Sequence, residues 1–250
     1  MRKWAAIAVS AAMTIAAVPA SAATMVFDLT GNTSTSGTAG NSRIFSATDG
    51  TTTIQVRATA WSATPLKSGG YSISKAYLGD YSYGLGVTAA GDGNGSNNEH
   101  TIDNKGSIDF VVLQFSQVVQ VGNAALTPFS ISGSIDNDST IGIGSTSAAW
   151  NSAVNFTDLS LFGNFYDLYG NGRTSTIDIN PNGFQGNLLL VGASFDNDRN
   201  YDGFKLGSLT VSTVPPPAVP EPATWAMMIG GMALVGTAMR RRRRIGHALA

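Results

Sequence analysis

The sequence predicts an all-β fold, a single jelly-roll-like β-sandwich over residues 23–213. Apolar residues come in short pulses of strand length, and segments rich in Gly, Asn, Ser and Thr separate them. Helical periodicity is absent between the two ends of the chain, with Ser147 to Val154 as the one weak candidate. About ten strands joined by Gly and Asn turns favour a sandwich over other all-β folds.

Three patterns locate individual strands. Between Ile54 and Ala60, apolar and polar residues alternate with the period of a half-buried strand. Residues 110–113, with Phe115 just beyond, form an almost continuous apolar run, which predicts a strand covered on both faces. In the last pulse, the apolar residues change parity around Gly207, where a β-bulge would restore their facing.

The first 22 residues have the pattern of a secretory signal peptide. A positive start at Arg2 and Lys3 precedes an apolar run over residues 4–18 and the small-residue pattern Ala-Ser-Ala at 20–22. A permanent anchor is the less favoured alternative, because this run of 15 residues is shorter than the roughly 20 that a spanning helix needs. We therefore expect signal peptidase to cut before Ala23, at a site formed by Ala20, Ala22 and Ala23.

The C-terminal end has a more specific pattern. A Pro-rich linker over residues 214–219, which we expect to be extended and stiff, precedes Pro-Glu-Pro at 220–222. Trp225 and Ala226 follow, then an apolar run to Met239 and five consecutive arginines. A helix over 225–239 would be about 22 Å long, shorter than a hydrocarbon core of about 30 Å.

We nevertheless expect residues 225–239 to form a single transmembrane helix. Trp225 suits one membrane interface, the arginine stems can extend to the other, and a thin bilayer can match a short helix. Moving one guanidinium through the bilayer centre costs roughly 2.5 to 3.5 kcal/mol. The arginines should therefore stay in the cytoplasm and the preceding domain outside. A plain anchor with a basic end explains this hydropathy, but it leaves the Pro-Glu-Pro and Trp-Ala spacing unexplained.

This order of elements resembles the PEP-CTERM sorting signal of Gram-negative, biofilm-forming bacteria. The resemblance covers residues 220–244 and implies recognition by an exosortase, a membrane-embedded transpeptidase-like enzyme that cleaves near Pro-Glu-Pro. It implies that the chain is a substrate, delivered from a membrane-anchored precursor to the cell surface or extracellular matrix. The implied recognition residues are Pro220, Glu221, Pro222, Trp225 and Ala226, and the implied retention residues are Arg240, Arg241, Arg242, Arg243 and Arg244.

The charge of the segment between the two ends limits the possible partners. Residues 23–219 contain eight Lys and Arg against 15 Asp and Glu, a net charge of −7. We expect no nucleic-acid partner, because affinity for phosphate backbones comes mainly from Lys and Arg. The chain has no cysteine, so the exported domain has to be stabilised by its core without disulfides.

A distinctive internal stretch runs through Tyr77–Tyr81, Gly84–Thr88, the acidic glycine loop 91–96 and Glu99–Asn104, and ends in the apolar strand after Ile108. This arrangement resembles the exosortase-dependent surface proteins, from about Thr30 to Ile143. The resemblance implies a β-rich surface domain. It brings no ligand or activity with it.

The acidic loop has two interpretations. Its oxygen-bearing side chains are typical of Ca²⁺ ligands, namely Asp92, Asn94, Ser96, Glu99 and Asp103. An EF-hand would have glycine in the sixth position, where Asn97 stands, so we prefer a surface turn in which Asp and Asn cap their own backbone. The clusters 136–138 and 196–198, with Asp202, have the same two interpretations, hairpin turn or cation site.

The sequence lacks a recognisable catalytic set, so we expect no enzyme and, apart from Ca²⁺, no cofactor. His100 is the only histidine of the exported segment; without Cys or His neighbours it cannot form a zinc site, and we expect it to make a structural hydrogen bond. Three hypotheses follow: a structural or adhesive surface component of a biofilm matrix, a module that binds Ca²⁺ or extracellular polysaccharide, and a glycan hydrolase. The last stays open because paired carboxylates have no fixed sequence spacing.

Overall fold

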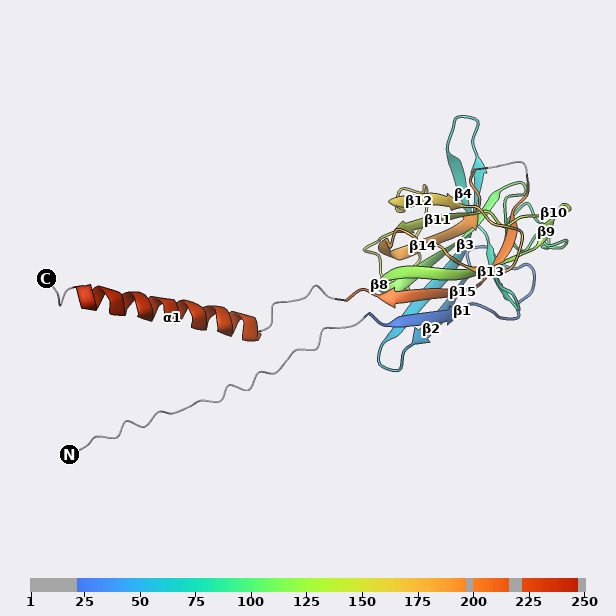
Figure 1. Cartoon of the computed structure of the whole chain (residues 1–250). Coiled ribbons are helices and arrows are strands. Elements are labelled where there is room, and N and C mark those ends of the chain that lie inside the picture. The colour runs from blue at the N-terminus through green and yellow to red at the C-terminus, as the bar shows by residue number, and fades with distance from the viewer. Residues whose placement is uncertain (1–21, 197–199, 216–221, 247–250) are drawn as a thin grey trace. The chain divides into compact units, whose positions relative to one another are not determined.

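The computed structural model describes residues 22–196, 200–215 and 222–246. They fall into two units, one spanning Ala22–Val214 and the other containing the helix α1 (Pro222–Gly246). The first unit is built from β-strands, and none of its described residues is helical (Figure 1). This confirms the all-β prediction and shows that Ser147 to Val154 form no helix. Of the predicted signal peptide over residues 1–22, residues 1–21, including Ala20, lie outside the described residues, as do Pro220 and Glu221.

Fifteen strands make up the first unit. They are β1 (Thr24–Asp28), β2 (Ser42–Thr48), β3 (Thr53–Pro65), β4 (Tyr71–Lys75), β5 (Tyr77–Tyr81), β6 (Gly84–Thr88), β7 (Ile102–Asp103), β8 (Ile108–Pro128), β9 (Ser130–Ile131), β10 (Ser134–Ile135), β11 (Ser139–Gly144), β12 (Asn164–Leu168), β13 (Ser175–Asp178), β14 (Gln185–Ala193) and β15 (Gly203–Thr213).

Thirteen of these strands pair into one antiparallel sheet, and β9 and β10 form a separate hairpin. The main path runs β12-β11-β14-β8-β15-β6-β5. The 21-residue strand β8 joins its two parts. The first half of β8 lies between β3 and β14, whereas its second half pairs with β15 and β13.

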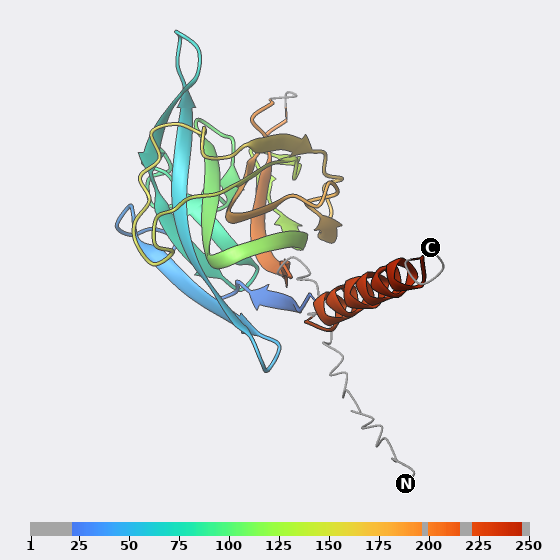
Figure 2. The same cartoon turned by 90° about the vertical axis from the view of Figure 1, so that its left-hand side faces the viewer.

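This continuous sheet differs from the two separate sheets that a jelly-roll-like sandwich would have. Figure 2 shows the cause: β8, in green, bends and continues as a strand with new partners. The sequence divides β8 into two apolar pulses around Gln117, and they look like two strands. One strand that turns a corner gives the same pattern of pulses, so the sequence could not distinguish the two arrangements.

The β-bulge predicted at Gly207 is confirmed. The register between β15 and β8 shifts between Leu206 and Ser208, and the apolar side chains before and after the shift are both buried. The carbonyl oxygen of Gly207 accepts a hydrogen bond from the backbone N–H of Leu29 at 3.0 Å. The irregularity in β15 therefore also fixes the chain that leaves β1.

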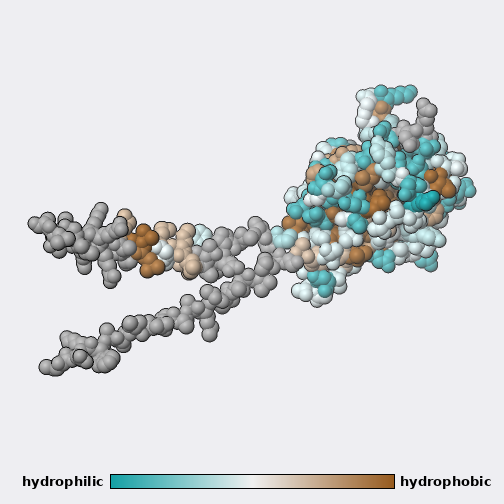
Figure 3. All heavy atoms as spheres, in the orientation of Figure 1, coloured by the Kyte–Doolittle hydropathy of each residue, from teal (hydrophilic) through white to brown (hydrophobic). Residues whose placement is uncertain are grey.

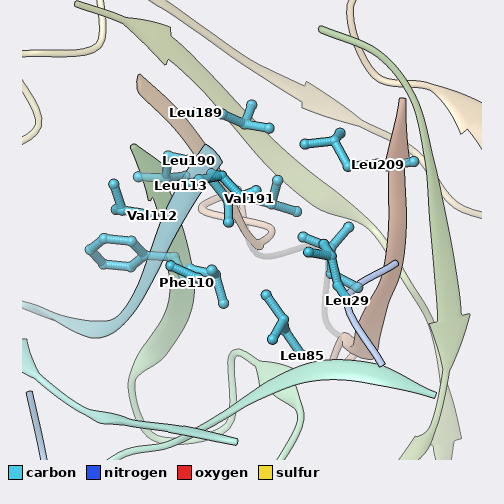
Figure 4. Close-up of a cluster of buried hydrophobic side chains, with 14 of the residues drawn as sticks. Leu29, Leu85, Phe110, Val112, Leu113, Leu189, Leu190, Val191 and Leu209 are labelled. Carbon is cyan, nitrogen blue, oxygen red and sulfur yellow. The ribbon is translucent and has the colours of Figure 1, made fainter. Parts of the chain in front are cut away.

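The core of the first unit contains the apolar residues that the strand patterns placed inside. Apolar positions of β3 and the 110–115 run of β8 are buried. Figure 4 shows Leu29, Leu85, Phe110, Leu113 and Leu190 from four parts of the chain in one cluster. Each such side chain stabilises the fold by roughly 1.5 to 3 kcal/mol when fully buried, which supplies a core without disulfides.

The second unit forms a helix, but the transmembrane helix expected over residues 225–239 is not confirmed. Helix α1 has 25 residues and continues past Met239 through all five arginines. Within the described parts of the chain, no helix combines the length and the apolar character needed to cross a membrane. The apolar part of α1 is too short for this task, because the five arginines occupy the last turns of the helix. Trp225 is 52 % exposed in α1.

Candidate functional site

The acidic loop between β6 and β8 is organised by its own side chains. Asp92 Oδ2 accepts a hydrogen bond from the N–H of Ala89 at 2.6 Å, and Asn94 Oδ1 accepts one from the N–H of Ser96 at 3.2 Å. Asp103 Oδ1 likewise accepts the N–H of Lys105 at 3.0 Å. These are the backbone-capping bonds of the turn interpretation.

The remaining acidic residue of the loop has a charged partner. Glu99 Oε1 accepts a hydrogen bond from Lys105 Nζ at 2.6 Å, in one of two ion pairs that the described residues form. Four of the five side chains that the sequence suggested as Ca²⁺ ligands, Asp92, Asn94, Glu99 and Asp103, therefore engage a group within the loop. Ca²⁺ binding at this loop stays a prediction.

His100 makes the structural hydrogen bond that the sequence led us to expect. Its Nδ1 lies 2.7 Å from the carbonyl oxygen of Gly95, which places the proton on Nδ1 because a carbonyl can only accept. The ring also packs edge-on against Tyr81, with 4.9 Å between centroids. Burial lowers the pKa of His100, and the nearby charge of Lys205 lowers it further.

The carboxylates that converge most closely lie elsewhere. Asp136, Asp138 and Asp202 each place one carboxylate oxygen within 4.8 Å of the others. All three accept hydrogen bonds: Asp136 from Asn200 Nδ2, Asp138 from the N–H of Gly170, and Asp202 from Asn104 Nδ2. The sequence allows a hairpin turn or a cation site at 136–138 and at the cluster with Asp202, and the structure brings the two clusters together. These hydrogen bonds connect the three carboxylates to neighbouring loops, and we assign them no ion.

Burial and mutual repulsion perturb the carboxyl groups around the acidic loop. Burial raises the pKa of Asp103 to about 7 and that of Asp92 to about 6, and neighbouring negative charges add to both shifts. Burial also raises the pKa of Asp109, well above its ordinary value of 3.8, with a contribution from the charge of Asp103. The loop therefore covers several carboxyl groups that are destabilised in their charged form.

A cavity of about 450 Å³ lies beside this loop. Asp92, Glu99 and Lys105 contribute charged groups to its lining, and Ser62, Thr64, Ser74 and Ser107 contribute hydroxyl groups. Such a lining can donate to and accept from a hydroxylated ligand. Asp92 and Glu99, two of the acidic residues that the sequence singled out, thus border a cavity that no sequence pattern revealed.

A second cavity, of about 400 Å³, contains a residue that sequence analysis missed. Lys205 in β15 contributes to its lining and is 2 % exposed. The sequence placed Phe204 and Leu206 on the buried face and left Lys205 on the other. The bulge at Gly207 returns Leu209 to the face of Phe204 and Leu206, so no sequence pattern indicated that the face of Lys205 is also covered.

Comparison with known proteins bears on the C-terminal end. A family model described as the PEP-CTERM protein-sorting motif matches residues 218–244. No curated protein and no solved structure matches the chain. The matched segment contains the Pro-Glu-Pro element, Trp225 and Ala226, and the arginine cluster, and the match confirms the resemblance inferred from them. The chain therefore carries a PEP-CTERM protein-sorting motif, which indicates export and recognition by an exosortase in a membrane-anchored precursor.

Proposed function

We propose that this protein is a non-catalytic component of the cell surface or extracellular matrix, with a structural or adhesive role. We also propose that the first unit, Ala22–Val214, called the β-domain from here on, is displayed after exosortase processing. The observation that carries this proposal is the PEP-CTERM motif at residues 218–244. In this proposal the β-domain is delivered to the surface, and the tail at residues 218–244 is the sorting signal. In this function the motif residues are bound and cut by another protein and perform no chemistry of their own.

The division between the two units supports such processing. Every residue of the hydrophobic core lies within 23–211, and the tail forms a unit separate from Ala22–Val214. A cut near Pro-Glu-Pro would therefore leave the core of the β-domain intact. It would remove an exposed apolar helix, whose Met227, Ile229 and Leu234 are between 63 and 79 % exposed.

The start of the β-domain is equally suited to processing. The N–H of Ala23 donates to Thr213 Oγ1 at 2.8 Å, and its carbonyl oxygen accepts the N–H of Thr213 at 2.8 Å. Ala23 is thus held beside the end of β15, whereas Ala22 is exposed. Cleavage by signal peptidase before Ala23 would remove no residue of β1.

The outer surface of the β-domain fits exposure to water. Figure 3 shows hydrophilic residues over much of the face in view, with hydrophobic residues in scattered patches. The net charge of −7 over residues 23–219 favours solubility. A display role requires such a surface and requires no active site.

Mass spectrometry of the protein from cells with and without the exosortase tests the proposal. We expect a chain that begins at Ala23 and ends near residue 220 in the first case, and a chain that retains its arginines in the second. Replacing residues 220–222 by alanine should also preserve the tail, whereas replacing Pro215–Pro217 should not. Identical C-termini in both strains, or an unprocessed chain in the cytosol, would contradict the proposal.

A separate measurement tests whether the displayed protein has a structural or adhesive role or is only displayed. Cells that lack the gene should differ from wild type in aggregation or matrix composition, and expression of the intact gene should restore both. Unchanged aggregation and matrix composition would remove the structural or adhesive role while leaving the processing result standing. Incubation of the purified protein with glycans should release no fragments, since we propose no catalysis.

A further inference from the structure

The cavity that contains Lys205 is formed by five separated parts of the chain. Asn32 follows β1, Tyr81 and Tyr83 flank the turn between β5 and β6, His100 precedes β7, Phe129 follows β8, and Lys205 lies in β15. Its volume of about 400 Å³ falls within the range of small-molecule sites, about 300 to 1,000 Å³. The lining combines aromatic rings with a few polar groups, the usual composition of such sites.

Lys205 is the only charged side chain in this lining apart from the ionisable His100 ring. Its Nζ donates a hydrogen bond to the carbonyl oxygen of His100 at 3.1 Å and lies 3.5 Å from the centroid of the Tyr81 ring. Phe129 lies farther away, at 5.3 Å from the same nitrogen. The two ion pairs found among the described residues belong to Arg43 and Lys105, so the Lys205 ammonium is without a carboxylate there.

A buried ammonium in this setting is stabilised less than it would be in water. A carbonyl dipole and an aromatic face offset part of the desolvation cost, but they carry no net negative charge. Burial accordingly lowers the pKa of Lys205 to about 7. An anion entering the cavity would restore the missing counter-charge and would form a charge-assisted hydrogen bond with Nζ.

The aromatic rings specify what else the ligand should present. Tyr83 is 57 % exposed, and its ring meets that of Phe129 edge-on with 5.7 Å between centroids. They offer an apolar surface at the mouth of the cavity, on which the C–H face of a sugar ring can pack. The exposed side chains of Asn32 and Ser82 offer an amide and a hydroxyl group to the rim of such a ring.

We propose that this cavity binds a carboxylated sugar of the uronic acid type. The carboxylate pairs with Lys205 Nζ, and the sugar ring packs against Tyr83 and Phe129. The alternative is that Lys205 is only structural: its hydrogen bond to the carbonyl oxygen of His100 would then hold β15 in place, and the cavity would bind no ligand. The proposal goes beyond display at the cell surface and is independent of how the tail is processed.

Calorimetric titration of the purified full-length chain with glucuronate, glucose and acetate tests this site. At concentrations up to about 20 mM, which cover millimolar affinities, glucuronate should bind saturably, and glucose and acetate should bind at least about tenfold more weakly. Glucuronate that fails to bind, or glucose that binds equally well, would overturn the proposal. Acetate that binds as tightly as glucuronate would overturn the assignment of a sugar.

Two variants separate the site from the fold. Lys205→Met retains a long side chain in the buried position and should lose glucuronate binding at least about tenfold, whereas Lys67→Met, at an exposed lysine, should bind as wild type. Tyr83→Ala changes an exposed turn residue, so this variant should fold while its affinity falls. Should Lys205→Met fail to fold, the Tyr83→Ala result decides, and unchanged affinity there would overturn the proposal.

Discussion

Asn104 and Asp202, which are 98 residues apart in the chain, exchange two hydrogen bonds. Asn104 Nδ2 donates to Asp202 Oδ2 at 2.6 Å, and the N–H of Asp202 donates to Asn104 Oδ1 at 2.9 Å. Both residues are buried, and the N–H of Ser194 donates to the same carboxylate oxygen at 3.2 Å. The pair fastens the segment after β7 to the start of β15, which carries Lys205.

Replacing Asn104 by alanine should destabilise the β-domain. The variant removes both bonds and takes away one of the donors to the buried Asp202 Oδ2, at a cost of about 2 kcal/mol in the free energy of unfolding. Urea denaturation measures this change. Asn151→Ala, at an exposed loop position, should shift the free energy by less than about 0.5 kcal/mol. Equal stability of the two variants would contradict the inferred importance of the pair.

Gly84→Ala should be more damaging than an ordinary glycine substitution. Gly84 has φ of +117°, and a Cβ there would lie 2.1 Å from the carbonyl oxygen of Leu206. Gly50 has φ of +94° with open space around it, so Gly50→Ala measures the backbone strain alone. We expect Gly84→Ala to lose at least about 1 kcal/mol more stability than Gly50→Ala. A similar loss in both variants would show that β15 can move away.

Phe156 holds the long segment between β11 and β12 against the sheet. Its ring meets that of Trp61 edge-on at 5.1 Å and stacks on Phe162 at 5.7 Å, measured between centroids. Phe156→Ala should cost about 3 kcal/mol in the free energy of unfolding and should speed hydrogen exchange over residues 145–163. Tyr169→Ala, at a 75 % exposed side chain, should change neither measurement. Slow exchange in the Phe156 variant would show that other contacts hold the segment.

Asp103 should make the protein less stable as the pH rises from about 4 to about 7. Its pKa is about 7 in the folded state, against an ordinary value of 3.8, so the folded state binds more protons than the unfolded state in this window. The contribution of Asp103 to stability is therefore fully present below pH 3.8 and is lost as the pH rises past about 7. Asp92, with a pKa of about 6, acts in the same direction.

Urea denaturation at several pH values measures this effect, and Asp103→Asn is the matching variant. Asparagine keeps the size of the side chain and cannot ionise, so the decline with pH should become shallower. Asp49→Asn is the control, because Asp49 is exposed and its pKa is lowered by hydrogen bonds from the N–H groups of Thr52 and Thr51. An unchanged slope in Asp103→Asn would show that its carboxyl group is more hydrated than its burial indicates.

Lys205 should have the opposite effect on the alkaline side. Burial lowers its pKa from 10.5 to about 7, so between these values the unfolded state binds more protons and stability rises with pH. Together with Asp103, this gives a minimum of stability near pH 7. Lys205→Met should remove the rise above pH 7 while leaving the acid side unchanged, as denaturation over the same pH series would show. A variant that retains the rise would exclude Lys205 as its source.

The sequence predicted those parts of the fold that depend on nearest neighbours. Alternation between Ile54 and Ala60 identified β3, and the change of parity at Gly207 located a bulge that the register confirms. The continuity of β8 was missed, because a bend in one strand and a break between two strands have the same local pattern. The transmembrane helix was expected from a short apolar run, and the structure gives a helix without the apolar length for that task.

The candidate sites depended on distant neighbours and were less predictable. Asp92 and Glu99 were considered as Ca²⁺ ligands for their oxygen-bearing side chains, with a surface turn preferred, and the structure shows them in hydrogen bonds within the loop and at the edge of a cavity. For Asp136 and Asp202 a hairpin turn and a cation site were both left open, but the sequence did not indicate that their carboxylates converge. Lys205 attracted no attention at all, since a single lysine in a strand is ordinarily exposed.

By itself, the sequence determined the all-β class and the sorting motif at residues 218–244, because both are written in the order of residues along the chain. Only the tertiary structure decided that β8 serves both parts of the sheet and that Lys205 is buried beside Tyr81 without a carboxylate among the described residues. The physical reason is that burial and charge pairing depend on which strands lie side by side. His100 and Tyr81, more than a hundred positions before Lys205, set the environment of its ammonium group, and no local sequence pattern predicts these contacts.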